Sequence, residues 1–127
     1  MLIATQPRPS LKRILICTGK IGHELRAERQ RRQDSSTAVL SIEQLYPFPA
    51  DELGAELDRF GDAREIVWVQ EEPANMGALF YVLPQIERLL RGRHLRTVKR
   101  SRSASPATGS PKAHRIEQQT LVSLAFG

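Results

Sequence analysis

Two neighbouring carboxylates, Glu71 and Glu72, follow the apolar run Ile66–Val69 and stand directly before Pro73. Paired carboxyl groups can act as general acid and general base when both reach the same bond. Adjacent residues of a strand point to opposite faces of a sheet, however, so these two side chains are not expected to share a reacting centre. The pattern therefore favours separate charged contacts over shared catalysis.

A second apolar run ends in polar, aromatic and proline residues, in the sequence Glu43–Pro49. A buried strand needs neither paired carboxylates nor a Pro-Phe-Pro turn at its exit, so both strand exits are expected to contact something beyond their own sheet. The candidate contact residues are Glu43, Gln44, Tyr46, Phe48, Glu71 and Glu72. The alternative is an ordinary strand-end turn in which Tyr46 and Phe48 cover the edge of the sheet.

A basic, hydroxyl-rich segment leads into the last expected helix. Its candidate anion-binding residues are Arg100, Arg102, Ser103, Ser105, Thr108, Gly109, Ser110 and Lys112. Backbone N–H groups at a helix N-terminus bind phosphate, and basic side chains strengthen such a site. The alternative is a packed loop whose hydroxyl groups satisfy its own backbone.

The cysteine and histidine residues show no catalytic or metal-binding spacing. Cys17 ends the apolar run Ile14–Cys17 without an evident neighbouring base, which favours a buried, reduced thiol over a nucleophile. The spacing of the three histidines His23, His94 and His114 along the sequence does not suggest a metal site. Surface or capping roles are expected for them. No metal ligands are predicted.

Length and composition indicate a small soluble protein. A chain of 127 residues suits one core, and we expect a flexible segment at residues 1–10 followed by a single domain at residues 11–127. Hydrophobic residues make up 40% and charged residues 26%, which suggests neither a membrane span nor general disorder. No apolar signal-peptide core precedes the first strand, so the cytoplasm is the expected location.

The net charge of +5 arises from 19 basic and 14 acidic residues, and the basic residues form two clusters. The clusters comprise Arg26, Arg29, Arg31 and Arg32, and then Arg88, Arg91, Arg93, Arg96, Lys99, Arg100 and Arg102. Basic clusters bind nucleic acid through counterion release, but no aromatic residues interleave with these to stack bases. A solvated or interfacial basic face is therefore favoured over a nucleic-acid site.

Short apolar runs alternate with helical patterns, which is typical of a parallel sheet covered by helices. Strands are expected at Arg13–Cys17, Ala38–Ile42, Glu65–Val69 and Leu95–Lys99. The third run is continuously apolar, as expected for a central strand buried on both faces.

Four helices are expected between and after these strands. Gly22–Arg32 offers only Ile21, Leu25 and Ala27 to a core and should be weakly docked, whereas Ala50, Leu53, Leu57 and Phe60 form a clear apolar stripe ending before Gly61. The third helix should run from about Met76 to Leu90, with a kink or break near Leu83 because of Pro84. The last should begin with Ser110 as cap and Pro111 in its first turn, and pack through Ala113, Ile116, Thr120 and Leu124.

Three motifs together resemble one protein family. They are Ser41–Pro49, Val67–Pro73 with Asn75 and Gly77, and Ser103–Ser110, and the likeness extends from the first strand at Ile14–Lys20 to His114, Glu117 and Gln118. In their order and spacing they resemble the C-terminal domain of 2-oxoglutarate dehydrogenase, a thiamine-diphosphate-dependent enzyme. His114 is the histidine to test first, because its neighbours match the family.

The resemblance implies a transketolase C-terminal-like domain, which is a three-layer α/β/α sandwich with a mostly parallel sheet of four to five strands. It implies a full enzyme that uses thiamine diphosphate and magnesium, oxidatively decarboxylates 2-oxoglutarate in the tricarboxylic acid cycle, forms a homodimer and passes the succinyl group to a lipoyl acyltransferase. The cofactor-binding Gly-Asp-Gly segment of the family is missing here, because Gly61-Asp62 is followed by Ala63. No catalytic or cofactor-binding residue is therefore assigned.

The expected role is assembly, through contacts with the remaining domains or with a second subunit of the dehydrogenase. The alternative is a stand-alone regulatory module that binds a nucleotide or acyl-coenzyme A through the basic tail segment.

Overall fold

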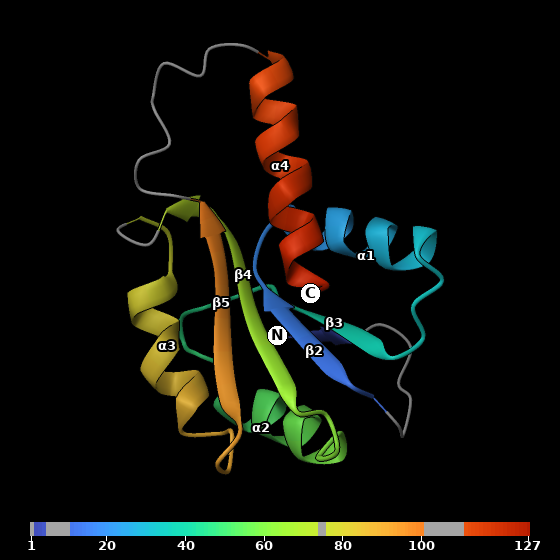
Figure 1. Cartoon of the computed structure of the whole chain (residues 1–127). Coiled ribbons are helices and arrows are strands. Elements are labelled where there is room, and N and C mark those ends of the chain that lie inside the picture. The colour runs from blue at the N-terminus through green and yellow to red at the C-terminus, as the bar shows by residue number, and fades with distance from the viewer. Residues whose placement is uncertain (1, 5–10, 74–75, 101–110) are drawn as a thin grey trace.

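The computed structural model of the chain describes residues 2–4, 11–73, 76–100 and 111–127. Its elements, in chain order, are β1 (Leu2–Ala4), β2 (Arg13–Cys17), α1 (Ile21–Arg31), β3 (Thr37–Ile42), α2 (Ala50–Arg59), β4 (Glu65–Pro73), α3 (Leu79–Glu87), β5 (His94–Arg100) and α4 (Pro111–Ala125). Helices cover both faces of the sheet, which gives three layers (Figure 1). The expected α/β/α sandwich is confirmed.

The sheet has five strands in the order β1-β3-β2-β4-β5. β2, β3, β4 and β5 are parallel, and β1 pairs antiparallel with β3. All four strands expected from the sequence are present, although β4 continues to Pro73 through a register irregularity that begins at Val69. Leu2–Ala4, within the segment that was expected to be flexible, form the edge strand β1.

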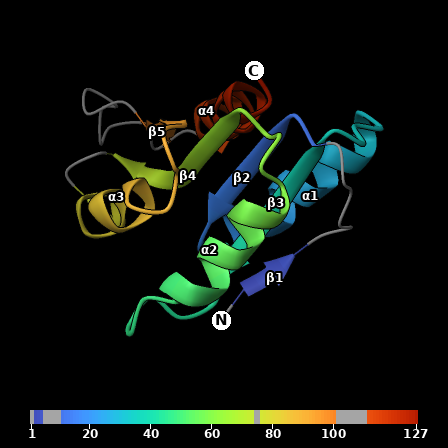
Figure 2. The same ribbon diagram turned by 90° about the horizontal axis from the view of Figure 1, so that it is seen from below.

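β2, β3 and β4 send alternate side chains into two separate apolar cores, because side chains of a strand alternate between its faces. Ile14, Ile16, Ile66 and Trp68 pack with α2 and α3 on one face. On the other face, Leu15, Cys17, Val67 and Val69 pack with α1 and α4. Figure 2 shows α2 lying across the first of these faces, with α4 on the far side of the sheet. β2 and β4 are therefore buried on both faces.

Helix α1 is anchored more firmly than its sparse apolar pattern indicates. It buries Ile21, Gly22 and Leu25, and also Arg29, whose Nε donates to the carbonyl oxygen of Thr37 at 2.6 Å. Ala27, in contrast, is exposed, so its expected place in the core is wrong. A charged side chain that hydrogen-bonds to a strand carbonyl replaces the apolar contact that the sequence lacks.

Helix α2 follows its predicted stripe, and the guanidinium of Arg93 closes its C-terminus. Leu53, Leu57 and Phe60 are buried, but Ala50 at the first turn is exposed. Arg93 donates to the carbonyl oxygens of Leu57, Phe60 and Ala63 at 2.9, 3.1 and 3.0 Å. A cation at this position satisfies carbonyl groups that have no intrahelical donor.

Helix α3 is shorter than expected and runs through Pro84 without a break. It begins at Leu79 rather than near Met76, and Phe80 in its first turn is exposed. Of the kink or break expected near Leu83, the break does not occur, because the helix continues to Glu87. Pro84 itself is exposed, so the carbonyl that loses its helical donor lies on a side of the helix that solvent can reach.

Helix α4 packs through a different face from the one expected. Leu121, Val122 and Ala125 are buried, whereas Ile116 and Leu124 are each 53% exposed and Thr120 is exposed. The first turns of α4 rise beyond the carboxyl ends of β4 and β5, so only its second half lies over the sheet (Figure 1). The predicted cap Ser110 lies outside the described residues, and Pro111 is the first helical residue as expected.

Gly22 lets α1 approach the sheet closely. A Cβ atom at this position would lie 2.6 Å from Ser41 Oγ and 3.3 Å from Cys17 Sγ. Ser41 cannot turn away freely, because its Oγ accepts a hydrogen bond from Arg26 Nη2 at 2.7 Å. The glycine is therefore required for close helix–strand contact.

We predict opposite effects for two glycine-to-alanine substitutions in helices. Gly22→Ala should lower the free energy of unfolding by about 1–3 kcal/mol, because the added methyl group overpacks the contact with Ser41. Gly54→Ala in α2 should raise it by about 0.5–1 kcal/mol, because its Cβ would make only ordinary contact, at 3.4 Å from Leu89, while helix propensity improves. Urea unfolding of both variants checks this, and equal stability of the two would contradict it.

Candidate functional site

β2 and β4 are neighbours in the sheet, and the connections that follow them leave their carboxyl ends in opposite directions. β2 leads to β3 on one side, and β4 leads to β5 on the other. In open α/β sheets, this arrangement creates a crevice outside the carboxyl ends of the strands. Here the crevice has a volume of about 410 Å³ and is lined by Thr18, Gly19, Tyr46, Trp68, Gln70, Glu71, Glu72, Gly77 and Ala78.

Tyr46 lines one side of the crevice and belongs to a cluster of aromatic side chains. The rings of Tyr46 and Tyr81 lie 4.4 Å apart, and Phe48 meets Tyr81 edge-on at 6.3 Å. The hydroxyl of Tyr81 donates to the carbonyl oxygen of Leu45 at 3.1 Å, which joins α3 to the turn after β3. Tyr46 nevertheless remains 65% exposed, whereas Phe48 is half-buried against the core.

The buried side chain of Gln70 shapes the loop on the opposite side. Its Oε1 accepts from Trp68 Nε1 at 3.0 Å, and its Nε2 lies 3.0 Å from each of three carbonyl oxygens, those of Glu72, Pro73 and Met76. Gln70 is only 3% exposed. One carboxamide therefore fixes the end of β4 and the start of the segment that leads to α3.

The two carboxylates near the end of β4 have different surroundings, as the alternation of a strand predicts. Glu71 Oε1 accepts from Gln118 Nε2 at 3.0 Å and lies 4.0 Å from Lys20 Nζ, on the side of α1 and α4. Glu72 is exposed and lies against Gly77, on the side of the loop before α3. The expectation that they do not act together on one bond agrees with these different neighbours.

Two of the predicted contact residues have smaller roles. Gln44 donates from Nε2 to the carbonyl oxygen of Tyr46 at 2.8 Å, which stabilises the turn itself. Glu43 is exposed at the exit of β3. Thr18 fastens this exit to β2, because its Oγ1 donates to the carbonyl oxygen of Ile42 at 2.7 Å.

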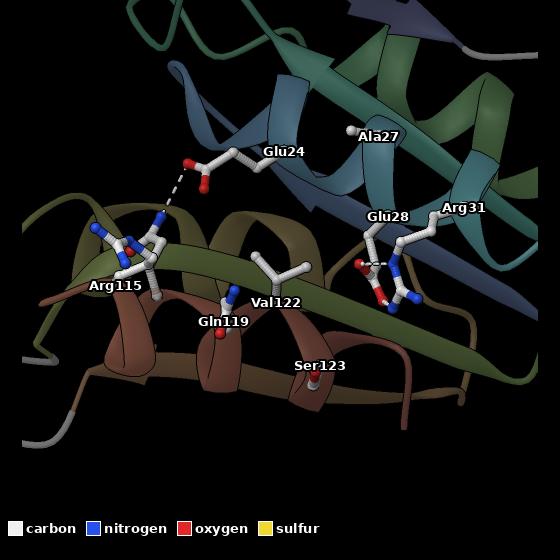
Figure 3. A pocket seen from close by; sticks show the side chains of 9 residues that line it. Glu24, Ala27, Glu28, Arg31, Arg115, Gln119, Val122 and Ser123 are labelled. Atoms are coloured by element: carbon white, nitrogen blue, oxygen red, sulfur yellow. Dashed lines mark hydrogen bonds and ion pairs between the residues drawn. The ribbon is translucent and has the colours of Figure 1, made fainter. Parts of the chain in front are cut away.

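A second hollow, of about 560 Å³, lies between α1 and α4. Figure 3 shows Glu24, Glu28 and Arg31 of α1 facing Arg115 and Gln119 of α4. Most of its charged groups are already engaged inside the protein. Hydrogen bonds from Arg31 and Arg32 lower the pKa of Glu28 to about 2, and Glu24 accepts from Gln118 Nε2 at 2.9 Å.

The predicted anion site is described only at its two ends. Arg102, Ser103, Ser105, Thr108, Gly109 and Ser110 lie outside the described residues. Arg100 donates to Glu117 Oε2 at 3.2 Å and also hydrogen-bonds to Gln118 Oε1, so its guanidinium is used within the protein. Lys112 is exposed in the first turn of α4.

The cysteine and histidine residues occupy the positions that the sequence indicates. Cys17 is a buried free thiol, and burial raises its pKa, although Ser41 and Arg26 partly oppose this effect. His23, His94 and His114 are exposed. No group of three or more His, Cys, Asp or Glu side chains in the described residues is placed to hold a metal ion.

Gly61 and Asp62 lie in an exposed turn between α2 and β4, at the edge of the sheet opposite the crevice. The backbone N–H of Ala63 closes this turn on the carbonyl oxygen of Phe60 at 3.0 Å. Gly61 and Asp62 are therefore part of the turn that ends α2. Within the described residues, no helix has the length and apolar character needed to cross a membrane.

Sequence reasoning did not find Thr18, Gly19, Gln70 or Tyr81 as parts of the site. One signal was available for Gln70. It is a polar residue that follows Ile66 and Trp68 at the alternate positions that face the core, so it requires hydrogen-bond partners. Tyr81 gave no such signal, because its contact with Leu45 spans 36 residues.

The layered α/β architecture and its mixed sheet define the class of fold, and comparison with known proteins identifies the family. The family described as "2-oxoglutarate dehydrogenase C-terminal" matches residues 3–126. The chain therefore belongs to the 2-oxoglutarate dehydrogenase C-terminal family.

Several relatives share this region. The "2-oxoglutarate dehydrogenase E1 component" of Cupriavidus necator is 43% identical over 117 residues, which cover 91% of this chain and 12% of the relative. The "Multifunctional 2-oxoglutarate metabolism enzyme" of Mycolicibacterium vanbaalenii is 39% identical, over 97% of this chain and 10% of its own length. The chain thus spans about a tenth of these relatives.

Replacing the carboxamide of Gln70 should loosen the crevice. Gln70→Glu removes the donor that faces three carbonyl oxygens and places a carboxylate among them, so the free energy of unfolding should fall by about 1–3 kcal/mol. The exposed Gln30→Glu serves as the control and should change it by less than about 0.5 kcal/mol. Denaturant unfolding followed by Trp68 fluorescence measures both, and an unchanged midpoint for Gln70→Glu would contradict the assignment.

Proposed function

We propose that this chain is the C-terminal assembly domain of a thiamine-diphosphate-dependent 2-oxoglutarate dehydrogenase and organises the dimer of the full enzyme. In this proposal the decarboxylation of 2-oxoglutarate, the thiamine diphosphate, the magnesium ion and the transfer to a lipoyl acyltransferase depend on other parts of that enzyme. The setting is the cytoplasm and the tricarboxylic acid cycle. This chain contributes a docking surface and no reacting group.

The observation that carries the proposal is the exposed aromatic surface at the carboxyl edge of the sheet. Tyr46, Met76 and Phe80 are 65%, 58% and 69% exposed, and they belong to the exit of β3 and the segment from β4 into α3. Gln70 and Tyr81 hold the backbone beneath these side chains. Large apolar side chains gathered on a firm scaffold are typical of a protein–protein interface.

The small share of the relatives that this chain covers supports the same role. It matches 12% of the Cupriavidus necator protein, so most of a family enzyme is available to contact it. A domain with two complete apolar cores and an uncovered aromatic edge has the features of a part that docks.

The alternative, a regulatory module that binds a nucleotide or acyl-coenzyme A, depends mainly on residues outside the described part of the chain. Of its two described members, Arg100 already pairs with Glu117 and Gln118. This engagement favours assembly over anion binding.

Complementation tests the proposal. The Cupriavidus necator relative is shortened by the region that this chain matches, and the missing region is supplied as a separate protein. This chain should bind the shortened protein and restore its 2-oxoglutarate-dependent decarboxylation, because the docking surface completes the dimer.

The relative's own C-terminal region, supplied in the same way, is the positive control. The proposal fails if that region restores activity while this chain, folded and at the same concentration, neither binds nor restores it.

A further inference from the structure

We propose that the aromatic edge beside the crevice receives an arginine side chain from the part of the dehydrogenase that this chain lacks. The inference rests on the proposed function and specifies the chemistry of the contact. The arginine would lie over Tyr46 and pair with Glu72. We define the docking patch as Tyr46, Glu72, Met76 and Phe80.

The carboxylate of Glu72 is the charged group of this patch that is open to a partner. Among the described residues it has no hydrogen bond or ion pair, whereas neighbouring Glu71 is held by Gln118 and lies close to Lys20. Glu72 is exposed, and its carboxylate lies over the backbone of Gly77, because a Cβ there would be 2.9 Å from Oε1. Gly77, with φ of +72°, lets the loop pass beneath this carboxylate.

Tyr46 provides an aromatic surface next to the same crevice. Its ring packs on Tyr81 with centroids 4.4 Å apart, and 65% of the residue is still exposed. A ring supported on one side and open elsewhere can receive a cation over its face. Arginine suits this position better than lysine, because a planar guanidinium stacks on an aromatic ring and pairs with a carboxylate at the same time.

Charge complementarity points to a basic occupant. The chain carries a net charge of +5, yet the exits of β3 and β4 carry Glu43, Glu71 and Glu72. Lys20 lies 4.0 Å from Glu71, and Arg100, the register partner of Pro73, is engaged by Glu117 and Gln118. An acidic patch on a basic protein selects for a cationic partner and against a second copy of the same basic chain.

The share of the relative that this chain covers indicates which part of the enzyme would supply the arginine. The chain matches 12% of the Cupriavidus necator relative, and the remaining part of that protein is the expected partner. Met76 and Phe80, 58% and 69% exposed, add apolar surface on the segment that leads from β4 into α3. Apolar contacts that exclude water strengthen a charged pair at an interface.

Reversing the charge of Glu72 tests this contact. Binding of the chain to the shortened Cupriavidus necator protein is measured by calorimetry at several salt concentrations. Glu72→Arg should weaken binding by about tenfold or more, and Glu72→Gln should weaken it less and flatten its dependence on salt. Tyr46→Leu, which keeps an apolar side chain but removes the ring, should weaken binding by about fivefold.

Glu87→Arg is the matched control. Glu87 is exposed at the end of α3, at the opposite edge of the sheet, and its charge reversal should leave binding unchanged. Each variant is first compared with the unaltered chain by thermal unfolding, and Glu72→Gln separates loss of the contact from loss of the fold because it keeps the shape of the side chain.

The outcomes separate this inference from the proposed function. If the unaltered chain binds and Glu72→Arg binds equally well, the arginine contact is wrong and the assembly role stands. If the unaltered chain does not bind while the relative's own C-terminal region does, the assembly role fails and the contact fails with it.

Discussion

The carboxamide of Gln70 controls the shape of the edge on which the functional argument depends. It is buried directly after the central run of β4, where it accepts from the Trp68 indole and donates towards three carbonyl oxygens of the following segment. Without this side chain, the indole and the three carbonyl groups would need other partners in a place that excludes most water. The positions of Glu72, Gly77 and Met76, and with them the wall of the crevice, follow from this arrangement.

Arginine side chains provide hydrogen bonds and ion pairs at helix ends and strand ends away from the crevice. Arg93 satisfies the last carbonyl groups of α2, and Arg96 donates to the carbonyl oxygens of Leu124 and Ala125 at the end of α4. Arg13 is buried and pairs with Glu65 at 3.2 Å. Burial raises the pKa of Glu65, but the hydrogen bonds and charges of Arg13 and Arg96 outweigh it, so this pKa lies below its ordinary value. Arg13, Arg93 and Arg96 thus have internal contacts within the fold.

Local patterns predicted the strands and the inner stripe of α2, because continuous apolar runs and helical spacing report burial directly. They failed where the packing depends on distant residues. The predicted buried face of α4 was wrong: Ile116 belongs to the half of the helix that extends beyond the sheet, and Leu124 lies outside the buried face that Leu121, Val122 and Ala125 form. The docking of α1 was underestimated because Arg29 reaches Thr37, and β1 was missed because Leu2–Ala4 pair with β3 about 40 residues away. Apolar runs that end in charged, aromatic and proline residues located the two strand exits, but the support from Gln70 and Tyr81 appeared only in three dimensions.

Hydrogen–deuterium exchange of the chain, alone and with the shortened Cupriavidus necator protein, tests most directly whether the carboxyl edge is the docking surface. The account predicts new protection of backbone amides in residues 43–48 and 76–81, and unchanged exchange in the turns at residues 60–64 and 91–93 at the opposite edge. Protection confined to those opposite turns, with exchange at 43–48 and 76–81 unaltered in a complex that has formed, would contradict it.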